Sequence, residues 1–364
     1  MKNTIRKTGK VLSYIAGIIL LVLLGYIIYL YVSYHRIPDN QELTVETISE
    51  EEKAGDQLTT GQKYSALTYN VGFGAYTPDF SFFMDGGKSS WAKSKESVKE
   101  TIKGAGELVA SRNPDFALLQ EVDLNSTRSY HVDEHSVLKE TIPAYDSVFA
   151  QNYDSAFLFY PFTQPHGKSR SGLALFSKYP VTDSLRRSFP VSTSFSKFFD
   201  LDRCYSISRV PVDNGRELVI FELHMSAYGN SDAIREGQIN MLAEDMAKEY
   251  DAGNYVICGG DFNHDLKASE DDSEDRESWA YPFPREKLPE HFGFCIDQLT
   301  EKEKASLWDS ARNADMEYVP GKTYTVTLDG FIISDNVECL SYEDIETGYS
   351  YSDHDPVYME FKLH

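Results

Sequence analysis

The feature of the sequence that most constrains the fold is an uncharged apolar run near the N-terminus. It extends from Val11 to Val32 and reads VLSYIAGIILLVLLGYIIYLYV. As an α-helix this run would be about 33 Å long, which is enough to cross the hydrocarbon core of a bilayer. The sequence therefore predicts a single N-terminal transmembrane helix over residues 11–32.

The charges beside this run predict its orientation. Residues 1–10 carry Lys2, Arg6, Lys7 and Lys10 and no acidic residue. By the positive-inside rule, 1–10 is a cytoplasmic basic segment and the rest of the chain is extracytoplasmic. A cleaved secretory signal is the alternative, but the run is longer than the ~7–15 residues of a typical signal core, and no small-x-small site follows it. A single-pass anchor in the cell membrane is therefore favoured, and both interpretations export the domain.

Beyond the span, residues 33–62 are polar and acidic and show no sustained apolar period. This pattern predicts a solvated stalk or linker. The remainder, 63–364, is long enough for one large domain with a sizeable core.

The charge of the chain bears on its substrates. With 35 basic and 57 acidic residues, the formal net charge is -22. Such a surface repels polyanions on average, which disfavours a protein that holds long nucleic acid by non-specific phosphate contacts. A small cationic cleft in an acidic body would escape this average, so a nuclease stays open.

Four cysteines, Cys204, Cys258, Cys295 and Cys339, would meet an oxidising compartment outside the cytoplasm, where their even number permits two disulfides. Cys204 and Cys258 lie in strand-like apolar runs, where small buried thiols are the favoured interpretation. The pairing of the four stays open.

Short apolar runs recur after Lys63 and predict strands. The runs are YSALTYNV, DFALLQEV, SGLALFS, CYSISRVPV, ELVIFELH, NYVICGGDF, TYTVTLDGFIIS and PVYMEF. Helical stretches are expected over 96–112 and 232–250, and the second places Ile239, Leu242 and Met246 on one face. This mixture favours an α/β domain in which two packed sheets are flanked by helices.

Polar residues close three of these runs. Asn70 ends YSALTYN, Glu121 ends DFALLQE, and His224 ends ELVIFELH. Amide and carboxylate oxygens are the ligands that Mg²⁺ or Mn²⁺ prefers. Each residue alone is more often a turn, capping or hydrogen-bonded strand-end residue, so a metal site is indicated only by the series as a whole.

The run CGGDFNHD places Asp261 and Asn263 just after a buried strand. A carboxylate beside an amide can accept a proton from water while the amide orients that water, as in-line attack at phosphorus requires. An Asx-type turn is the structural alternative.

An acid also interrupts the apolar run TVTLDGFIIS, and it needs a partner if it is buried. This acid is Asp329, and the run YSDHDP offers His354, which Asp353 precedes. An imidazole held by Asp329 would stay protonated and oriented, ready to stabilise charge on a phosphoryl group.

Taken in order, the strand-end Asn, L-Q-E, the strand-end His, G-D-x-N, the L-D strand and S-D-H-x-P resemble the endonuclease/exonuclease/phosphatase superfamily, from about Lys63 to Leu363. The resemblance implies a four-layer α/β/β/α sandwich of two mixed sheets, with the site at one end. It also implies metal-assisted hydrolysis of a phosphoester by water.

The resemblance also implies roles for single residues. Asn70 and Glu121 would hold Mg²⁺ or Mn²⁺, with Asp353 close to the ion. Asp261 would orient or deprotonate the water, with Asn263 beside it.

His224 and the Asp329–His354 pair would stabilise charge on the phosphoryl group, and Arg170 lies where relatives place a phosphate-contacting side chain. The stretch MSAYG after His224 departs from the family pattern, which leaves the contacts of that loop open. The segment 267–322 is expected to shape access to the cleft.

Three functions are consistent with these residues. The favoured one is a monomeric, membrane-anchored phosphodiesterase acting on a small or lipid-borne phosphoester, as in the sphingomyelinase-like and inositol-phosphate branches of the family. A surface nuclease resembling the deoxyribonucleases is the alternative, disfavoured by the acidic charge and the lack of a basic cluster. An inactive binding module ranks lowest, because every matched position keeps a competent side chain.

Overall fold

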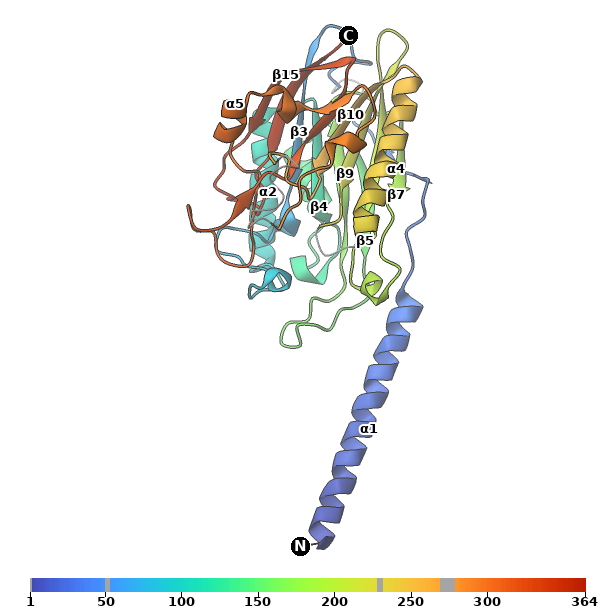
Figure 1. Cartoon of the computed structure of the whole chain (residues 1–364), viewed down its shortest axis with the longest axis vertical. Helices are drawn as coiled ribbons and strands as arrows, with labels where there is room; N and C mark the ends of the chain where they lie inside the picture. The colour runs from blue at the N-terminus through green and yellow to red at the C-terminus, as the bar shows by residue number, and fades with distance from the viewer. Residues whose placement is uncertain (1, 50–52, 228–231, 269–278) are drawn as a thin grey trace.

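Two β-sheets packed face to face form the centre of the structure, a computed structural model that describes residues 2–49, 53–227, 232–268 and 279–364 (Figure 1). In this part of the chain the first sheet has seven strands in the order β15 (Val337–Asp344), β16 (Val357–Leu363), β3 (Lys63–Asn70), β4 (Phe116–Asp123), β6 (Arg170–Ser177), β5 (Asp146–Asp154) and β2 (Val45–Glu46).

The second sheet also has seven strands among the described residues. Their order is β1 (Gln41–Glu42), β7 (Asp183–Ser188), β8 (Cys204–Pro211), β9 (Glu217–His224), β10 (Tyr255–Asp261), β14 (Asp329–Ser334) and β11 (Phe292–Phe294). Two further short strands, β12 (Ala311–Arg312) and β13 (Thr325–Val326), pair with each other.

Helices cover the outer faces of both sheets. The α-helices of the domain are α2 (Lys95–Arg112), α3 (Glu134–Thr141), α4 (Asp232–Asp251) and α5 (Glu301–Ser306), and η4 (Phe195–Phe198) is a short 3₁₀ helix. The helix α1 (Lys2–Ser33) extends away from the domain and covers neither sheet (Figure 1). Leu118 of β4 packs between the sheets, whereas its neighbours Ala117 and Leu119 pack under α2 and α3. This is the alternation expected of a strand covered on both faces.

On the other side, α4 buries its apolar face against the second sheet (Figure 1). The buried residues include Ile239, Leu242 and Met246, as their spacing predicts. The two helical layers and two mixed sheets confirm the expected four-layer α/β/β/α sandwich.

The sheet pairings bring several strand ends to one end of this sandwich. β3 and β4 run parallel with Asn70 beside Gln120, and β9 and β10 run parallel with Asp261 beside His224. β14 is antiparallel to β10 and places Asp329 opposite Asp261. Because neighbouring parallel strands end at the same edge of a sheet, residues far apart in the sequence meet there.

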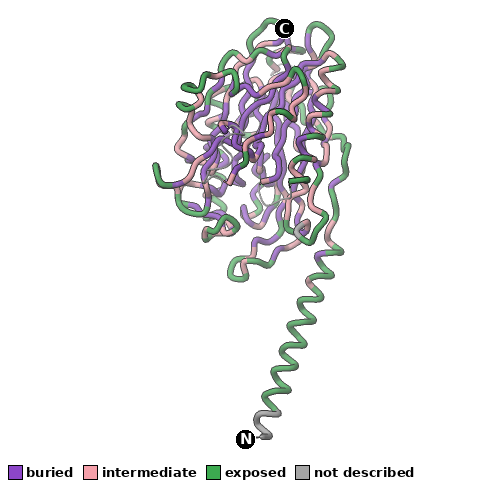
Figure 2. Tube along the Cα trace, viewed as in Figure 1, coloured by how far each residue is buried: buried purple, intermediate pink, exposed green. Residues whose placement is uncertain are grey.

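The helix α1 is long and apolar enough over Lys7–Ser33 to cross a membrane, and none of its apolar window is buried by the domain (Figure 2). It begins at Lys2, earlier than the predicted span, because the basic residues continue the same helix. Its length and composition fit both a membrane span and a signal sequence.

Short edge strands replace part of the solvated stalk expected over residues 33–62. β1 pairs with β7 in the second sheet, and β2 pairs with β5 in the first. Ile37 and Leu58 are buried, and Leu58 belongs to the core between the sheets. The segment has too few apolar residues to form a periodic pattern, but burial of those few is enough to hold it against the domain.

All four cysteines lie in the described part of the chain and are free thiols. Cys204 and Cys258 are fully buried, as their apolar surroundings predict.

Candidate active site

One carboxylate oxygen lies at the centre of the candidate site. Oδ2 of Asp261 lies 3.1 Å from Asn70 Nδ2, 3.4 Å from His224 Nε2 and 3.8 Å from His354 Nε2. These side chains come from both sheets and are all buried. Four residues predicted from separate motifs therefore meet at one point.

The predicted pair of Asp329 and His354 is present. His354 Nδ1 lies 2.7 Å from Asp329 Oδ2, which also accepts a 2.7 Å hydrogen bond from the Ser310 hydroxyl. Burial alone would lower the pKa of His354, but the charges of Asp329 and then Asp261 raise it well above its usual value. The imidazole is therefore protonated, and its Nε2–H is directed towards the site.

The pKa values of His224 and Asp261 are shifted by other combinations of burial and charge. Burial lowers the pKa of His224 well below its usual value, and the nearby charges of Arg203 and His354 lower it further, so this imidazole is neutral. Burial raises the pKa of Asp261 to about 7, against the opposing charge of His354 and with the added effect of Asp329. A carboxylate with this pKa can accept a proton near neutral pH.

The local geometry of CGGDFN explains how Asp261 is presented. Gly260 has a φ of +146°, and a Cβ at this position would lie 2.0 Å from the Leu223 carbonyl oxygen of β9. Only glycine permits this close approach. Asp261 Oδ1 accepts a 2.8 Å hydrogen bond from the Asn263 amide nitrogen, so the Asx-type turn is present. This turn leaves the other oxygen, Oδ2, to the site.

Glu121 reaches the site through an irregularity in β4. The register of β4 against β6 shifts between Leu119 and Val122, and Glu121 has a φ of +57°. A bulge of this kind re-aims a side chain next to a site. Asn70 Nδ2 lies 3.3 Å from Glu121 Oε1, so Asn70 donates its amide to the carboxylates of both Glu121 and Asp261.

These residues line a cavity of about 590 Å³. Its lining includes Glu121, His224, Asp261, Asn263, Asp353 and His354. Asn70 is fully buried behind Glu121, and Asp329 is fully buried behind His354. The convergence of the predicted residues on one cavity is what the enzymatic interpretation requires.

The donor set at this cavity fits a hard divalent cation. Burial raises the pKa of Asp353, and the charge of Glu121 raises it further although His354 opposes the effect. Asp85, which no sequence pattern singled out, lines the same cavity. Carboxylates that repel one another at one cavity are the oxygen ligands that Mg²⁺ or Mn²⁺ takes.

A second group, Asp261, Asp329 and His354, also places three ligand atoms within 4.8 Å of one another. It is less suited to a cation, because a protonated imidazole has no lone pair to offer a metal. The hydrogen bond between Asp329 and His354 already occupies two of the three ligand atoms of this group.

Arg170 does not line the cavity: it donates from Nη2 to Gln151 Oε1 at 3.3 Å. Three other arginines do line it, namely Arg128, Arg203 and Arg312. No motif in the sequence marks any of the three.

These three arginines differ in how firmly they are held. Arg128 binds both carboxylate oxygens of Asp123, at 3.1 and 2.9 Å. Arg312 donates to the backbone oxygens of Tyr76 and Thr77. Nε and Nη1 of Arg203 are buried and have no hydrogen-bond partner among the residues that the structure describes. Arg203 thus lines the cavity and has two buried unpaired nitrogens, whereas Arg170 and Arg312 each have one, at Nε.

Segment 267–322 contributes to the cavity lining where it is described. Trp279 and the residues from Ala311 to Asp315 line the cavity. Residues 269–278 of this segment lie outside the described residues.

The chain belongs to the endonuclease/exonuclease/phosphatase family, because the model of that family matches residues 67–298. Members of this family are divalent-metal-dependent phosphoester hydrolases, nucleases among them. The match confirms the resemblance that the ordered motifs indicate.

Known proteins agree with this assignment. An inositol phosphosphingolipids phospholipase C from Schizosaccharomyces pombe is 25% identical over 218 residues, covering 56% of this chain and 47% of that protein. The chain thus spans about half the length of this relative.

Among solved structures, an endonuclease/exonuclease/phosphatase from Beutenbergia cavernae matches with a TM-score of 0.58 and 15% identity, over 83% of this chain and 72% of that chain. TDP2 from D. rerio, complexed with a single-strand DNA product, matches with a TM-score of 0.55 and 16% identity, over 83% and 100%. At these identities the two structures support the fold alone.

Proposed function

We propose that the protein is a membrane-anchored, divalent-metal-dependent phosphodiesterase that hydrolyses a lipid-borne or small phosphoester outside the cytoplasm. The observation that carries the proposal is the meeting of Asn70, His224 and His354 around Asp261 Oδ2, beside a cavity that also holds Glu121. The sheet topology brings these strand ends together, but it does not require that carboxylate, amide and imidazole side chains occupy them.

Glu121 and Asp353 would hold the cation, and Asn70, whose amide nitrogen contacts Glu121, would complete its ligands through Oδ1, which now accepts from the Gly72 amide. A bound Mg²⁺ or Mn²⁺ supplies Lewis-acid stabilisation of a phosphoryl oxygen and offsets the repulsion between these carboxylates.

The remaining residues handle the proton and the phosphoryl charge. Asp261, with its raised pKa, accepts a proton from the attacking water, and Asn263 next to it helps to orient that water. The protonated His354, held by Asp329, donates to a phosphoryl oxygen as negative charge develops there. His224 is neutral and contributes a hydrogen bond. Arg170 would reach the phosphate only after leaving Gln151, so Arg203 is the better candidate for that contact.

A lipid-borne substrate is favoured by two features of the chain. The N-terminal helix can hold the domain at a membrane, and the net charge of -22 disfavours long nucleic acid. The curated relative is by its name a phospholipase C acting on inositol phosphosphingolipids, which is a membrane substrate.

The test is hydrolysis by the full-length protein in mixed micelles. Inositol phosphosphingolipid, sphingomyelin and phosphatidylinositol are compared with supercoiled plasmid, each with Mg²⁺ and with chelator. We expect Mg²⁺-dependent release of a phosphorylated head group, and loss of about 10²-fold or more in Asp261→Ala and His354→Ala. Cleavage of plasmid alone would favour the surface nuclease. Wild-type rates in both variants would point to a site that takes no part in hydrolysis.

The proposed orientation places residues 1–10 in the cytoplasm and the domain outside the cell membrane. Protease added to intact cells should then digest the domain and spare an epitope fused to the N-terminus. Release of the domain into the medium with a new N-terminus beyond residue 32 would instead identify a cleaved signal.

A further inference from the structure

The candidate active site lies at the end of the domain from which α1 leaves. Lys63, at the start of β3, pairs with Lys362 near the C-terminus, and β3 ends at Asn70. Tyr255, at the start of β10, donates its hydroxyl to the His364 carbonyl oxygen at 2.6 Å, so β10 runs in the same direction. The C-terminus lies at the end opposite α1, and the catalytic strand ends therefore point towards the helix (Figure 1).

The loop between β5 and β6 lies alongside the last turns of α1. Tyr26 donates its hydroxyl to the Phe157 carbonyl oxygen at 3.1 Å, and the Phe157 amide donates to the Tyr29 hydroxyl at 2.9 Å. The rings of Tyr26 and Phe159 meet edge to face at 5.1 Å. Tyr26 lies about 10 Å before the helix ends at Ser33. A membrane that surrounds the apolar helix up to its end must therefore also reach this loop.

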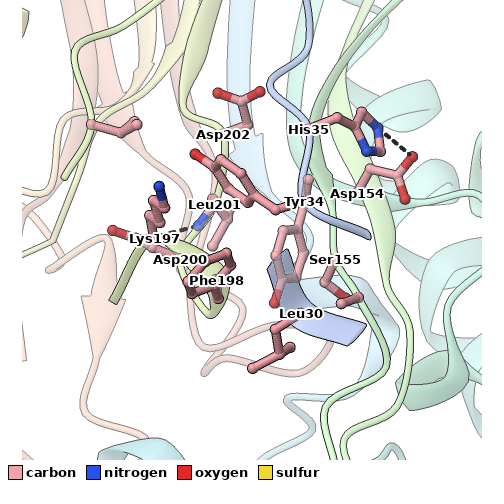
Figure 3. Close-up of a pocket in the computed structure, with 13 residues that line it drawn as sticks. Leu30, Tyr34, His35, Asp154, Ser155, Lys197, Phe198, Asp200, Leu201 and Asp202 are labelled. Atoms are coloured by element: carbon pink, nitrogen blue, oxygen red, sulfur yellow. Dashed lines mark hydrogen bonds and ion pairs between the residues drawn. The ribbon is translucent and has the colours of Figure 1, made fainter. Parts of the chain in front are cut away.

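The loop between β7 and β8, which contains η4, contacts the end of α1 and also lines the catalytic cavity. The ring of Phe198 lies 4.7 Å from Tyr31 and 5.1 Å from Tyr34. A small cavity between helix and domain is lined by Leu30 and Tyr34 on one side and by Phe198 and Leu201 on the other (Figure 3). Leu201 also lines the catalytic cavity. The mouth of the site is thus bounded by the loop that touches the helix.

Both loops expose aromatic side chains, which we name the aromatic rim. Its members are Phe159, Tyr160, Phe162, Phe195 and Phe199, with 49, 64, 83, 50 and 37% of their surfaces exposed. In the part of the chain that the structure describes, every exposed phenylalanine belongs to this rim. Clustered apolar exposure marks an interaction surface, and aromatic rings favour the membrane–water interface.

We propose that the aromatic rim inserts into the interface of the membrane that α1 spans, and that it holds the mouth of the catalytic cavity at the level of the lipid head groups. The inference rests on the proposed anchoring of the chain and deepens the proposed function, because it assigns the substrate to the lipids of that same membrane. A bilayer is favoured over a second copy of the chain because the rim is continuous with the apolar surface of the helix through Phe159.

Insertion is tested without reference to activity. Full-length Phe162→Trp is reconstituted with chelator into phosphatidylcholine vesicles whose acyl chains are brominated or unbrominated, beside the parent protein and Leu340→Trp. Leu340 is 41% exposed on β15, outside the rim, and is the matched control. We expect bromine to quench the added emission of Phe162→Trp and not that of Leu340→Trp. If bromine does not quench the added emission of Phe162→Trp, the proposal is overturned. It is also overturned if a second copy of the chain, detected as a cross-linked dimer, shields this position from the bromine.

The consequence for turnover is tested with Phe159→Ser/Phe162→Ser, two positions outside the cavity lining. We expect hydrolysis of vesicle lipid to fall about tenfold, because interfacial binding is lost, while hydrolysis of soluble bis(p-nitrophenyl) phosphate stays unchanged. Equal losses on both substrates contradict the inference. If the parent hydrolyses neither substrate, the proposed function fails, while the quenching result still decides whether the rim inserts.

Discussion

At the scale of single residues, Asp261 combines two roles that sequence patterns present as alternatives. One oxygen closes an Asx-type turn with Asn263, and the other receives Asn70 and faces both site histidines. The turn therefore fixes the direction of the catalytic oxygen. A GDxN run can therefore form an Asx-type turn and also supply a side chain to a site, because the carboxylate of its Asp has two oxygens.

Arg203 and Arg170 form a matched pair for testing which guanidinium contacts the phosphate. We expect Arg203→Ala to lower kcat/KM by about 10²-fold, because a guanidinium with two unpaired nitrogens is removed from the cavity lining, and Arg203→Lys to recover only part of this. Arg170→Ala should change kcat/KM by no more than about twofold, because Arg170 is bound to Gln151 away from the cavity. Steady-state kinetics on one soluble diester checks both expectations. A larger loss of kcat/KM in Arg170→Ala than in Arg203→Ala would restore Arg170 as the residue that contacts the phosphate.

Glu222 gives a pH prediction for stability. Its side chain is buried between the sheets 3.4 Å from Gln120 Nε2, and burial raises its pKa well above the usual value despite that hydrogen bond. The folded state then holds a proton that the unfolded state releases above about pH 4.3. This contribution to stability is complete below that pH and is lost as the pH rises towards the folded pKa.

Replacing this carboxyl group by an amide removes the pH dependence. We expect Glu222→Gln to unfold at a higher temperature than wild type at pH 8 and to lose this advantage at pH 4. Thermal unfolding followed by circular dichroism across this range is the measurement. A constant difference between the two proteins at every pH would show that Glu222 does not bind a proton on folding.

At the scale of elements, the segment after α1 is part of the sandwich. The β1 and β2 strands extend the edge of each sheet, and the fully buried Arg186 donates to the Pro38 carbonyl oxygen at 3.1 Å. The polar and acidic composition of this segment predicts that it is solvated. Two-residue edge strands and two buried apolar residues are too short and too few to produce a periodic pattern. The same limit applies to β7, whose six residues DSLRRS have little apolar character.

A soluble fragment that starts at Ile37 should therefore be more stable than one that starts at Lys63. Burial of Ile37 and Leu58 contributes roughly 4 kcal/mol together, which corresponds to a difference of roughly 5–10 °C in Tm. Leu58→Ala in the longer fragment should cost about 2–4 kcal/mol, whereas Leu340→Ala at an exposed site should cost little. Equal melting temperatures of the two fragments, measured by calorimetry, would show that the segment is not held.

At the scale of the whole molecule, an acidic body surrounds a cavity of mixed charge. The chain carries a net charge of -22, yet three arginines and the carboxylates Glu121 and Asp353 line the same cavity. Mixed charge of this kind suits a phosphoester together with a divalent cation. The surrounding acidic surface disfavours long polyanions, which would have to pass over it.

Binding of the cation should stabilise the entire fold. We expect Mg²⁺ or Mn²⁺ to raise the Tm of the chelated protein by a few degrees, because a ligand at 100 times its Kd contributes about 2.7 kcal/mol. Glu121→Gln and Asp353→Asn should abolish this shift, whereas Asp133→Asn, at the N-cap of α3 and outside the cavity lining, should keep it. Differential scanning fluorimetry checks this without any substrate. A shift that persists in Glu121→Gln and disappears in Asp329→Asn would place the cation at the second group instead.

Features that depend on near neighbours or on composition could be predicted from the order of the amino acids. An uncharged run gives one helix long enough to span, and short apolar runs give the strands of the sandwich. Fixed identities at strand ends, from Asn70 to His354, indicate the family because the chemistry of a phosphoester tolerates few substitutes at those places.

Tertiary structure alone decided which side chains share a cavity. Arg203, Arg128 and Asp85 carry no local pattern, and Arg170, which only the family resemblance indicates, does not line the cavity. The bulge that re-aims Glu121 and the loops that join the helix to the site depend on contacts between residues distant in sequence. Such contacts are set by how sheets pack and twist, and this is why no local stretch of the chain encodes them.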